Sequence, residues 1–355
     1  MLAARLPRSE NGEFLRRDVL GTLTISQWQE YAEAHPESTV FHHRAWLELL
    51  ANHYGMKLHV PALMEGDRVA AALPFLETRR LWGSRRLVAL PFTDCIHVLS
   101  DGEQVGDRFR EALVSADFAR FGAVVIRTDR PSRAAGAPSF WVRHTVDTSC
   151  GFERLAARVH VTAQQNVRRA QARRLSFECR RDCDGLHDFY RLHVKTRRRL
   201  GVPVQRSAFF DRLQSTLLAQ NLGFVALVRH GGTPIAAGVF LTYKSMMVYK
   251  YVASEPAALE HRPNDFLAWH ALRRAAELGF TTFDFGVSRR SQEGLRRFKR
   301  KWGAVESNVV NECLLGRMRP PIEDSQAMRW LSMAIRHTPE AFCRAVGAVA
   351  YPFSQ

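Results

Sequence analysis

The sequence lacks the features that mark a secreted or membrane-spanning protein. It contains no apolar run of about 18 residues or more, the length that a transmembrane helix needs. Residues 1–10 lack the apolar middle of a signal peptide. These absences predict a cytoplasmic protein, and they leave room for peripheral contact with the inner face of the cytoplasmic membrane.

Cysteine is scarce as well. The six cysteines are scattered without a CxxC pair, and Cys179 with Cys183 could supply only half of a four-ligand zinc site. We therefore expect reduced cysteines and no metal site.

Acidic residues are few compared with basic ones. The chain has 35 Asp and Glu against 51 Lys and Arg, a net charge of +16. A coding bias towards arginine could explain part of this excess, but it does not explain the basic clusters at residues 168–181 and 289–301. The clusters favour binding of a polyanion such as RNA, a nucleotide-linked sugar or an anionic membrane face.

The length of 355 residues favours two domains over one, and the sequence shows internal similarity. Two apolar segments separated by a glycine-containing turn, which predict a hairpin, occur at 62–71 and again at 226–237. Each hairpin is followed by an amphipathic helix and a strand, at 109–127 and at 266–285. We predict domains at 1–150 and 151–320, joined through one long basic helix at 152–175, and a helical tail at 321–355 that packs on the body.

The most informative stretch is TTFDFGVSRRSQEGLRRFKRKWG, residues 281–303. Its first five residues predict a buried strand, and Gly286 permits a turn that a side chain would obstruct. A cationic helix follows. It brings positive charge to the end of the strand, where it could stabilise an anionic substrate or the oxyanion of acyl transfer.

This stretch resembles the closing motif of the FemAB/FemX-like family, whose pattern is approximately DFG, a loop, then GLxxFKxxWG. Residues 167–170, 196–203 and 262–269 add to the resemblance. Members of the family are aminoacyl-tRNA-dependent peptidyltransferases with two acetyltransferase-like (GNAT) domains. The resemblance implies an α/β (α+β) fold of two tandem GNAT-like domains, each a mixed, largely antiparallel sheet flanked by helices.

The resemblance also suggests the catalytic residues. It implies that Lys299 stabilises the oxyanion or the donor, although a solvated charge is the simpler interpretation of a lysine in a basic helix. Phe298 could line the donor channel or belong to the core. Asp284 could orient Lys299 or accept a proton, or it could simply be satisfied by the neighbouring backbone and Arg289. Asp94 and Asp101 are weaker candidates for the base.

Further residues are predicted to bind substrate. Arg168 and Arg169 could hold phosphates of an acceptor or of tRNA, and Asn264 could orient the start of a helix. The remaining substrate-binding candidates are three basic residues, Lys195, Arg198 and Lys301, and the acidic Asp94.

An ordinary GNAT domain cradles the coenzyme A diphosphate in a glycine-rich loop before a helix. The corresponding residues 260–265 contain no glycine, and Pro263 removes one donor. We therefore expect no bound cofactor, with aminoacyl-tRNA as the donor substrate.

The predicted reaction is amide formation, in which an amino acid passes to an amine of a peptidoglycan precursor, another envelope acceptor or a specialised metabolite. The expected acceptor is nucleotide-linked or lipid-linked and anionic, and the expected oligomeric state is a monomer. One alternative is an acyl-CoA-dependent N-acyltransferase acting on an amino sugar. Another is a non-catalytic module that binds RNA or the envelope.

Overall fold

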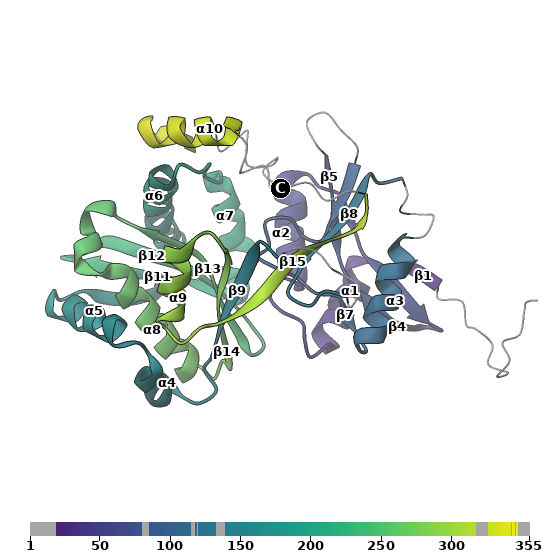
Figure 1. Cartoon of the computed structure of the whole chain (residues 1–355), viewed down its shortest axis with the longest axis horizontal. Helices are drawn as coiled ribbons and strands as arrows, with labels where there is room; N and C mark the ends of the chain where they lie inside the picture. The colour runs from purple at the N-terminus through teal and green to yellow at the C-terminus, as the bar shows by residue number, and fades with distance from the viewer. Residues whose placement is uncertain are drawn as a thin grey trace, which may run out of the picture.

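A computed structural model describes residues 19–79, 85–114, 118, 120–132, 139–316, 326–341, 343, 344 and 346. Two halves lie side by side, and helices flank the strands of each half (Figure 1). The predicted α/β (α+β) class, with mixed and largely antiparallel sheets, is confirmed. None of the helices in the described ranges is long and apolar enough to cross a membrane.

The first half begins with a strand and two helices: β1 (Val19–Thr22), α1 (Ile25–Ala34) and α2 (Arg44–Tyr54). A capping box between Thr24 and Gln27 starts α1, and left-handed Gly55 ends α2. The rest of this half comprises β2 (Leu58–His59), β3 (Pro61–Glu65), β4 (Arg68–Ala72), β5 (Phe75–Arg79), β6 (Arg85–Val88), β7 (Leu99–Ser100), α3 (Glu103–Val114) and β8 (Ala123–Thr128).

The second half repeats the plan with longer elements. They are β9 (Trp141–Asp147), α4 (Phe152–Arg158), α5 (Val161–Ala172), β10 (Ser176–Arg180), α6 (Cys183–Leu200), α7 (Ser207–Thr216), β11 (Gly223–His230), β12 (Thr233–Tyr243), β13 (Met246–Ser254), α8 (Pro263–Glu277), β14 (Thr282–Arg289), α9 (Glu293–Arg300) and β15 (Val305–Leu315). The short 3-10 helices Leu218–Gln220 and Pro256–His261 lie between them. Both predicted hairpins are present, as β3–β4 and β11–β12.

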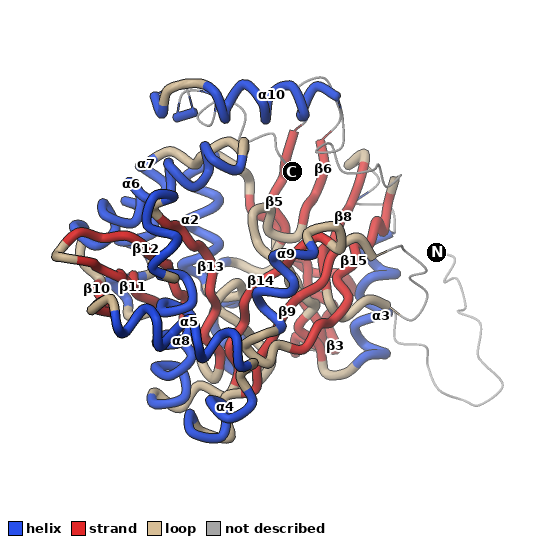
Figure 2. Tube along the Cα trace, turned by 60° about the vertical axis from the view of Figure 1, so that its left-hand side comes forward, coloured by secondary structure: helices blue, strands red, loops and turns tan. Residues whose placement is uncertain are grey.

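The two halves share one sheet. Its eleven strands run in the order β10-β11-β12-β13-β14-β9-β15-β8-β6-β5-β2, and a separate sheet holds β1-β3-β4-β7. β15 is the last strand of the second half in sequence, yet it pairs with β8 of the first half as well as with β9. Figure 2 shows the strands continuing from one half into the other. The pairing of β9 with β14 and β15 therefore joins the halves through backbone hydrogen bonds.

The prediction of one long helix at 152–175 is wrong. α4 ends at Arg158 and α5 begins at Val161, with extended backbone at Val159. The His160 N–H donates to the Lys301 carbonyl oxygen (2.8 Å), and the side-chain amide of Gln164 donates to the carbonyl oxygen of Val159 (2.9 Å). A tertiary contact and a side chain satisfy these backbone groups, so the helix can break here without a proline or a glycine. The sequence therefore carries no local signal of the break.

The tail helix α10 (Gln326–His337) lies on α6. Ile335 is buried, and Arg336 donates to the carbonyl oxygen of Leu200 (3.3 Å). Ser332 lies so close to Gly201 that a Cβ there would be 2.3 Å from the serine Oγ, so this left-handed glycine also makes room for the tail.

Candidate active site

The candidate site lies where two strands of the shared sheet separate. β13 and β14 run parallel and pair only at Met246–Val248 with Thr282–Asp284. Just beyond, β14 bulges between Asp284 and Val287 against β9, and Gly286 has a φ of +70°. The Asp-Phe-Gly sequence therefore forms an irregular backbone segment at the point of separation. Such bulges redirect side chains and are common beside active sites.

Lys299 reaches this bulge from α9. Its ammonium donates to the carbonyl oxygens of Gly286 (3.0 Å) and Val287 (3.3 Å), and the residue is 5% exposed. Burial lowers the pKa of Lys299 to about 8, against the opposing influence of nearby carboxylates, of which Asp94 is the strongest. Of the two interpretations of Lys299, the structure excludes the solvated charge.

Asp284 does not orient Lys299 by a direct bond. One of its carboxylate oxygens accepts from the Gly286 N–H (2.7 Å) and the other from Arg143 Nε (2.8 Å). Arg143, on β9, also donates to Asp129 after β8 (2.6 Å). Since both oxygens of Asp284 are occupied, the residue is better suited to holding the bulge than to accepting a proton.

Asp94 comes from the first half and lies against the same bulge. Its Oδ2 atom is 3.4 Å from the position that a Cβ on Gly286 would take. The loop before it is strained, because the non-glycine residues Leu90 and Phe92 both have positive φ, at 48° and 66°. Strain of this kind is often stored at functional sites, where the surrounding contacts maintain it.

Two contacts hold the Asp94 loop in place. Lys250, on β13, donates to the Phe92 carbonyl oxygen (2.9 Å) and to Asp94 Oδ2 (3.1 Å). Trp46 donates from its indole nitrogen to Thr93 Oγ1 (2.8 Å). The other carboxylate oxygen of Asp94 accepts no hydrogen bond from a described residue, and the side chain is 24% exposed. Asp94 is therefore the carboxylate of this site that is available to a substrate.

Sequence reasoning missed Lys250 and Arg143. Lys250 carried a signal, because it is the one charge within the apolar strand MMVYKYVAS. Its side chain is only 4% exposed, and its ammonium lies over the rings of Phe41, Trp46 and Tyr251. Arg143 had no comparable signal, since its partners lie 14 and 141 residues away in sequence.

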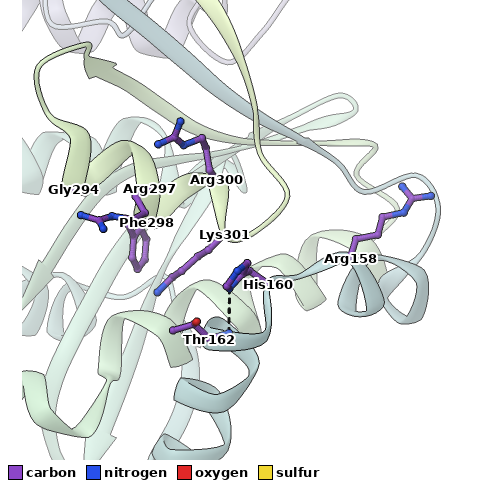
Figure 3. Close-up of a pocket in the computed structure, with 8 residues that line it drawn as sticks. All are labelled: Arg158, His160, Thr162, Gly294, Arg297, Phe298, Arg300 and Lys301. Carbon is purple, nitrogen blue, oxygen red and sulfur yellow. Dashed lines mark hydrogen bonds between the residues drawn. The ribbon is translucent and has the colours of Figure 1, made fainter.

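Phe298 and Lys301 lie on a different side of α9. Both line a pocket of about 590 Å³ between α9 and the α4–α5 junction, shown in Figure 3. Lys301 forms an ion pair with Asp265, and its ammonium lies 4.6 Å from the centre of the Phe298 ring. The structure thus separates Phe298 from the bulge that Lys299 contacts.

The other predicted substrate-binding residues are dispersed. Arg168 and Arg169 are exposed on α5, and neither lines this pocket. Lys195 pairs with Glu255 (2.6 Å), and the Nε of Arg198 is buried with no hydrogen-bond partner among the described residues. Asn264 donates weakly to Ser254 Oγ (3.4 Å), while its side-chain oxygen accepts no hydrogen bond within the described ranges.

α8 begins within residues 260–265, the segment predicted from the sequence to correspond to the diphosphate loop of an ordinary GNAT domain. Pro263 is its first residue, and the carboxylate of Asp265 is buried in its first turn. This carboxylate is held by Lys301 and by Asn166 (3.2 Å). A carboxylate, neutralised by Lys301, thus already lies at this helix N-terminus, where an anion could otherwise bind. In the described parts of the chain, no cluster of three or more His, Cys, Asp or Glu could hold a metal ion.

Comparison with known proteins supports the fold. Residues 157–300 match the family model described as acetyltransferase (GNAT) domain. The crystal structure of FemX has a TM-score of 0.67 at 14% identity, over 82% of this chain and 96% of that one. The C-terminal domain of a putative lysylphosphatidylglycerol synthetase from Agrobacterium fabrum has a TM-score of 0.57 at 15% identity, over 92% and 99%.

L-PGS from Bacillus licheniformis is also similar, with a TM-score of 0.53 at 13% identity, over 88% of this chain and 97% of that one. A search of curated protein sequences finds no match. At the level of the fold, the resemblance inferred from the closing motif is confirmed.

Proposed function

This chain carries an acetyltransferase-type (GNAT) domain within a FemX-like fold, and from that premise we propose that it is an acyltransferase that moves an amino acid from aminoacyl-tRNA to an amine. One observation carries the proposal: a buried lysine, Lys299, and an available carboxylate, Asp94, lie on two sides of the same glycine, Gly286. The proposed acceptor is an amine of a peptidoglycan precursor, another envelope molecule or a specialised metabolite.

Acyl transfer from an ester to an amine needs two groups that this site supplies. As the amine attacks, a C–N bond forms and the ester carbonyl becomes an oxyanion, which the Lys299 ammonium stabilises. The attacking amine loses a proton, which Asp94 accepts. The C–O bond then breaks, and the leaving 3′-oxygen of the tRNA takes up the proton that Asp94 accepted, which returns the carboxylate to its starting state.

Replacing Asp94 with asparagine is expected to lower kcat about 10²-fold. General-base catalysis contributes about 10²–10⁴, and we expect the low end because the partly exposed carboxylate can be replaced by water. Asp94→Asn keeps the size of the side chain, and Lys250 can still donate to its amide oxygen. Single-turnover transfer of a labelled amino acid measures the effect, with Asp67→Asn in the exposed β3–β4 turn as the control. A loss in kcat of less than threefold would show that Asp94 is not the general base.

Activity is expected to fall as the pH rises through about 8. Burial lowers the pKa of Lys299 to about 8, so the cation is present below that pH and is lost above it. A substrate amine, in contrast, becomes a better nucleophile as the pH rises. A profile of kcat from pH 6 to pH 10 should therefore show a descending limb near 8, and in Lys299→Arg this limb should move to higher pH because a guanidinium stays charged. A descending limb that is unchanged in Lys299→Arg would contradict the role of Lys299.

The choice of donor rests on the start of α8, where Pro263 and the buried Asp265 leave no cradle for a diphosphate. Incubation with charged total tRNA, each amino acid labelled in turn, and with envelope extract tests the proposal by mass analysis of the products. Transfer should stop after RNase treatment. Transfer that survives RNase, or that requires acetyl-CoA, would favour the acyl-CoA-dependent N-acyltransferase instead.

A further inference from the structure

The pocket between α9 and the α4–α5 junction is lined by an excess of basic side chains. Four of its eight lining residues are arginine or lysine, and none is acidic: Arg158, His160, Thr162, Gly294, Arg297, Phe298, Arg300 and Lys301. Like charges that surround one cavity repel each other, so their gathering favours a ligand that neutralises them.

Only part of this charge is neutralised within the protein. Arg300 pairs with Glu293, and Lys301 pairs with Asp265. Arg158 and Arg297 form no ion pair or side-chain hydrogen bond with any residue in the described parts of the chain. Two guanidinium groups are therefore left to bind an anion, and guanidinium matches the geometry of a phosphate well.

The two available guanidinium groups do not converge on one point. In Figure 3, Arg297 and Arg300 project from α9 on one side of the pocket, and Arg158 lies on the opposite side. Phe298, from α9, adds an aromatic face to the lining. Cations placed on both sides of a groove with an aromatic ring suit a chain of phosphates that carries flat bases.

We propose that this pocket binds a phosphodiester segment of RNA, and this inference rests on the proposed function. Residues two apart on a helix point to nearly opposite sides, so Arg297 and Lys301 face the pocket while Lys299 faces the bulge of β14. RNA held in the pocket therefore lies across one helix, about 10 Å wide, from the lysine that contacts the reacting ester.

The test is binding of fluorescently labelled, uncharged tRNA between 50 and 200 mM KCl, followed by anisotropy. The double variant Arg158→Ala/Arg297→Ala is compared with Arg79→Ala/Arg199→Ala, which removes two exposed arginines at the end of β5 and in the last turn of α6. Loss of two phosphate contacts should weaken binding roughly tenfold or more and reduce the slope of log K against log salt by about 1.4–1.8. The control pair should stay close to the wild type, and thermal melting should confirm that all variants are folded.

Binding and slope unchanged in Arg158→Ala/Arg297→Ala would overturn the proposal. A parallel titration with UDP separates the other source of nucleoside-linked phosphate: if the double variant loses UDP binding but keeps tRNA binding, the pocket serves a nucleotide-linked molecule and the RNA assignment is wrong. If tRNA binding depends on the two arginines but the wild type transfers no amino acid from any charged tRNA, the RNA site stands and the proposed function fails.

Discussion

Replacing Lys299 with methionine is expected to lower kcat about 10²–10³-fold, the usual cost of removing one oxyanion donor. The ammonium lies in a nearly dry position, 5% exposed, where a fixed charge acts more strongly on a developing oxyanion than it would in water. Methionine has a similar length and no charge, so Lys299→Met removes the electrostatic contribution while filling most of the same space.

Two further measurements separate a catalytic loss from a folding defect. Because burial disfavours the charged form of Lys299, replacing it should not lower the midpoint of urea unfolding appreciably, even though two carbonyl oxygens lose their donor. tRNA affinity should also stay near that of the wild type, since Lys299 does not line the cationic pocket. Lys57→Met, at an exposed lysine, is the matched control. A kcat of Lys299→Met within fivefold of the wild type would contradict a catalytic role for Lys299.

The parts of the site that sequence could predict are those encoded locally. The 281–303 stretch gave the strand, the turn at Gly286 and the cationic helix, because each depends on residues next to one another in the chain. Duplication was visible for the same reason, since each hairpin carries its own turn residues. Local patterns of this kind are the most reliable part of a sequence-based prediction.

The remaining parts depend on contacts between distant segments. Asp94 meets Gly286 across 192 residues only because β9 and β15 join the two halves into one sheet, and no local pattern encodes that pairing. The sequence also could not show whether Asp94 or Asp284 is available as the base. The answer depends on the hydrogen bond that Arg143 donates to Asp284. The sequence also did not show which of the basic residues near Lys299 are neutralised by acidic partners.

Replacing Arg143 with methionine is expected to destabilise the protein by about 3–5 kcal/mol, the cost of breaking a buried ion pair from one side. Arg143 is 13% exposed in its side chain and donates to two carboxylates, Asp284 and Asp129, which are 2% and 11% exposed. Burial opposes the charge of Arg143, but Asp284 and the other nearby anionic groups outweigh that effect and raise its pKa. Without the guanidinium, two negative charges would remain close together in a poorly solvated place.

The midpoint of urea unfolding measures this loss, and two controls test its cause. Arg127→Met makes the same change on β8, which β15 separates from β9 in the sheet. Arg127 donates to the neutral amide of Asn311 (3.0 Å) and forms no ion pair with a described residue, so the loss should be about 1–2 kcal/mol. The triple variant Arg143→Met/Asp129→Asn/Asp284→Asn removes the orphaned charges and should recover much of the stability. If Arg143→Met costs no more than Arg127→Met, the ion pairs of Arg143 do not contribute appreciably to the stability of the fold. The bulge of β14 would then depend on the backbone pairing with β9 alone.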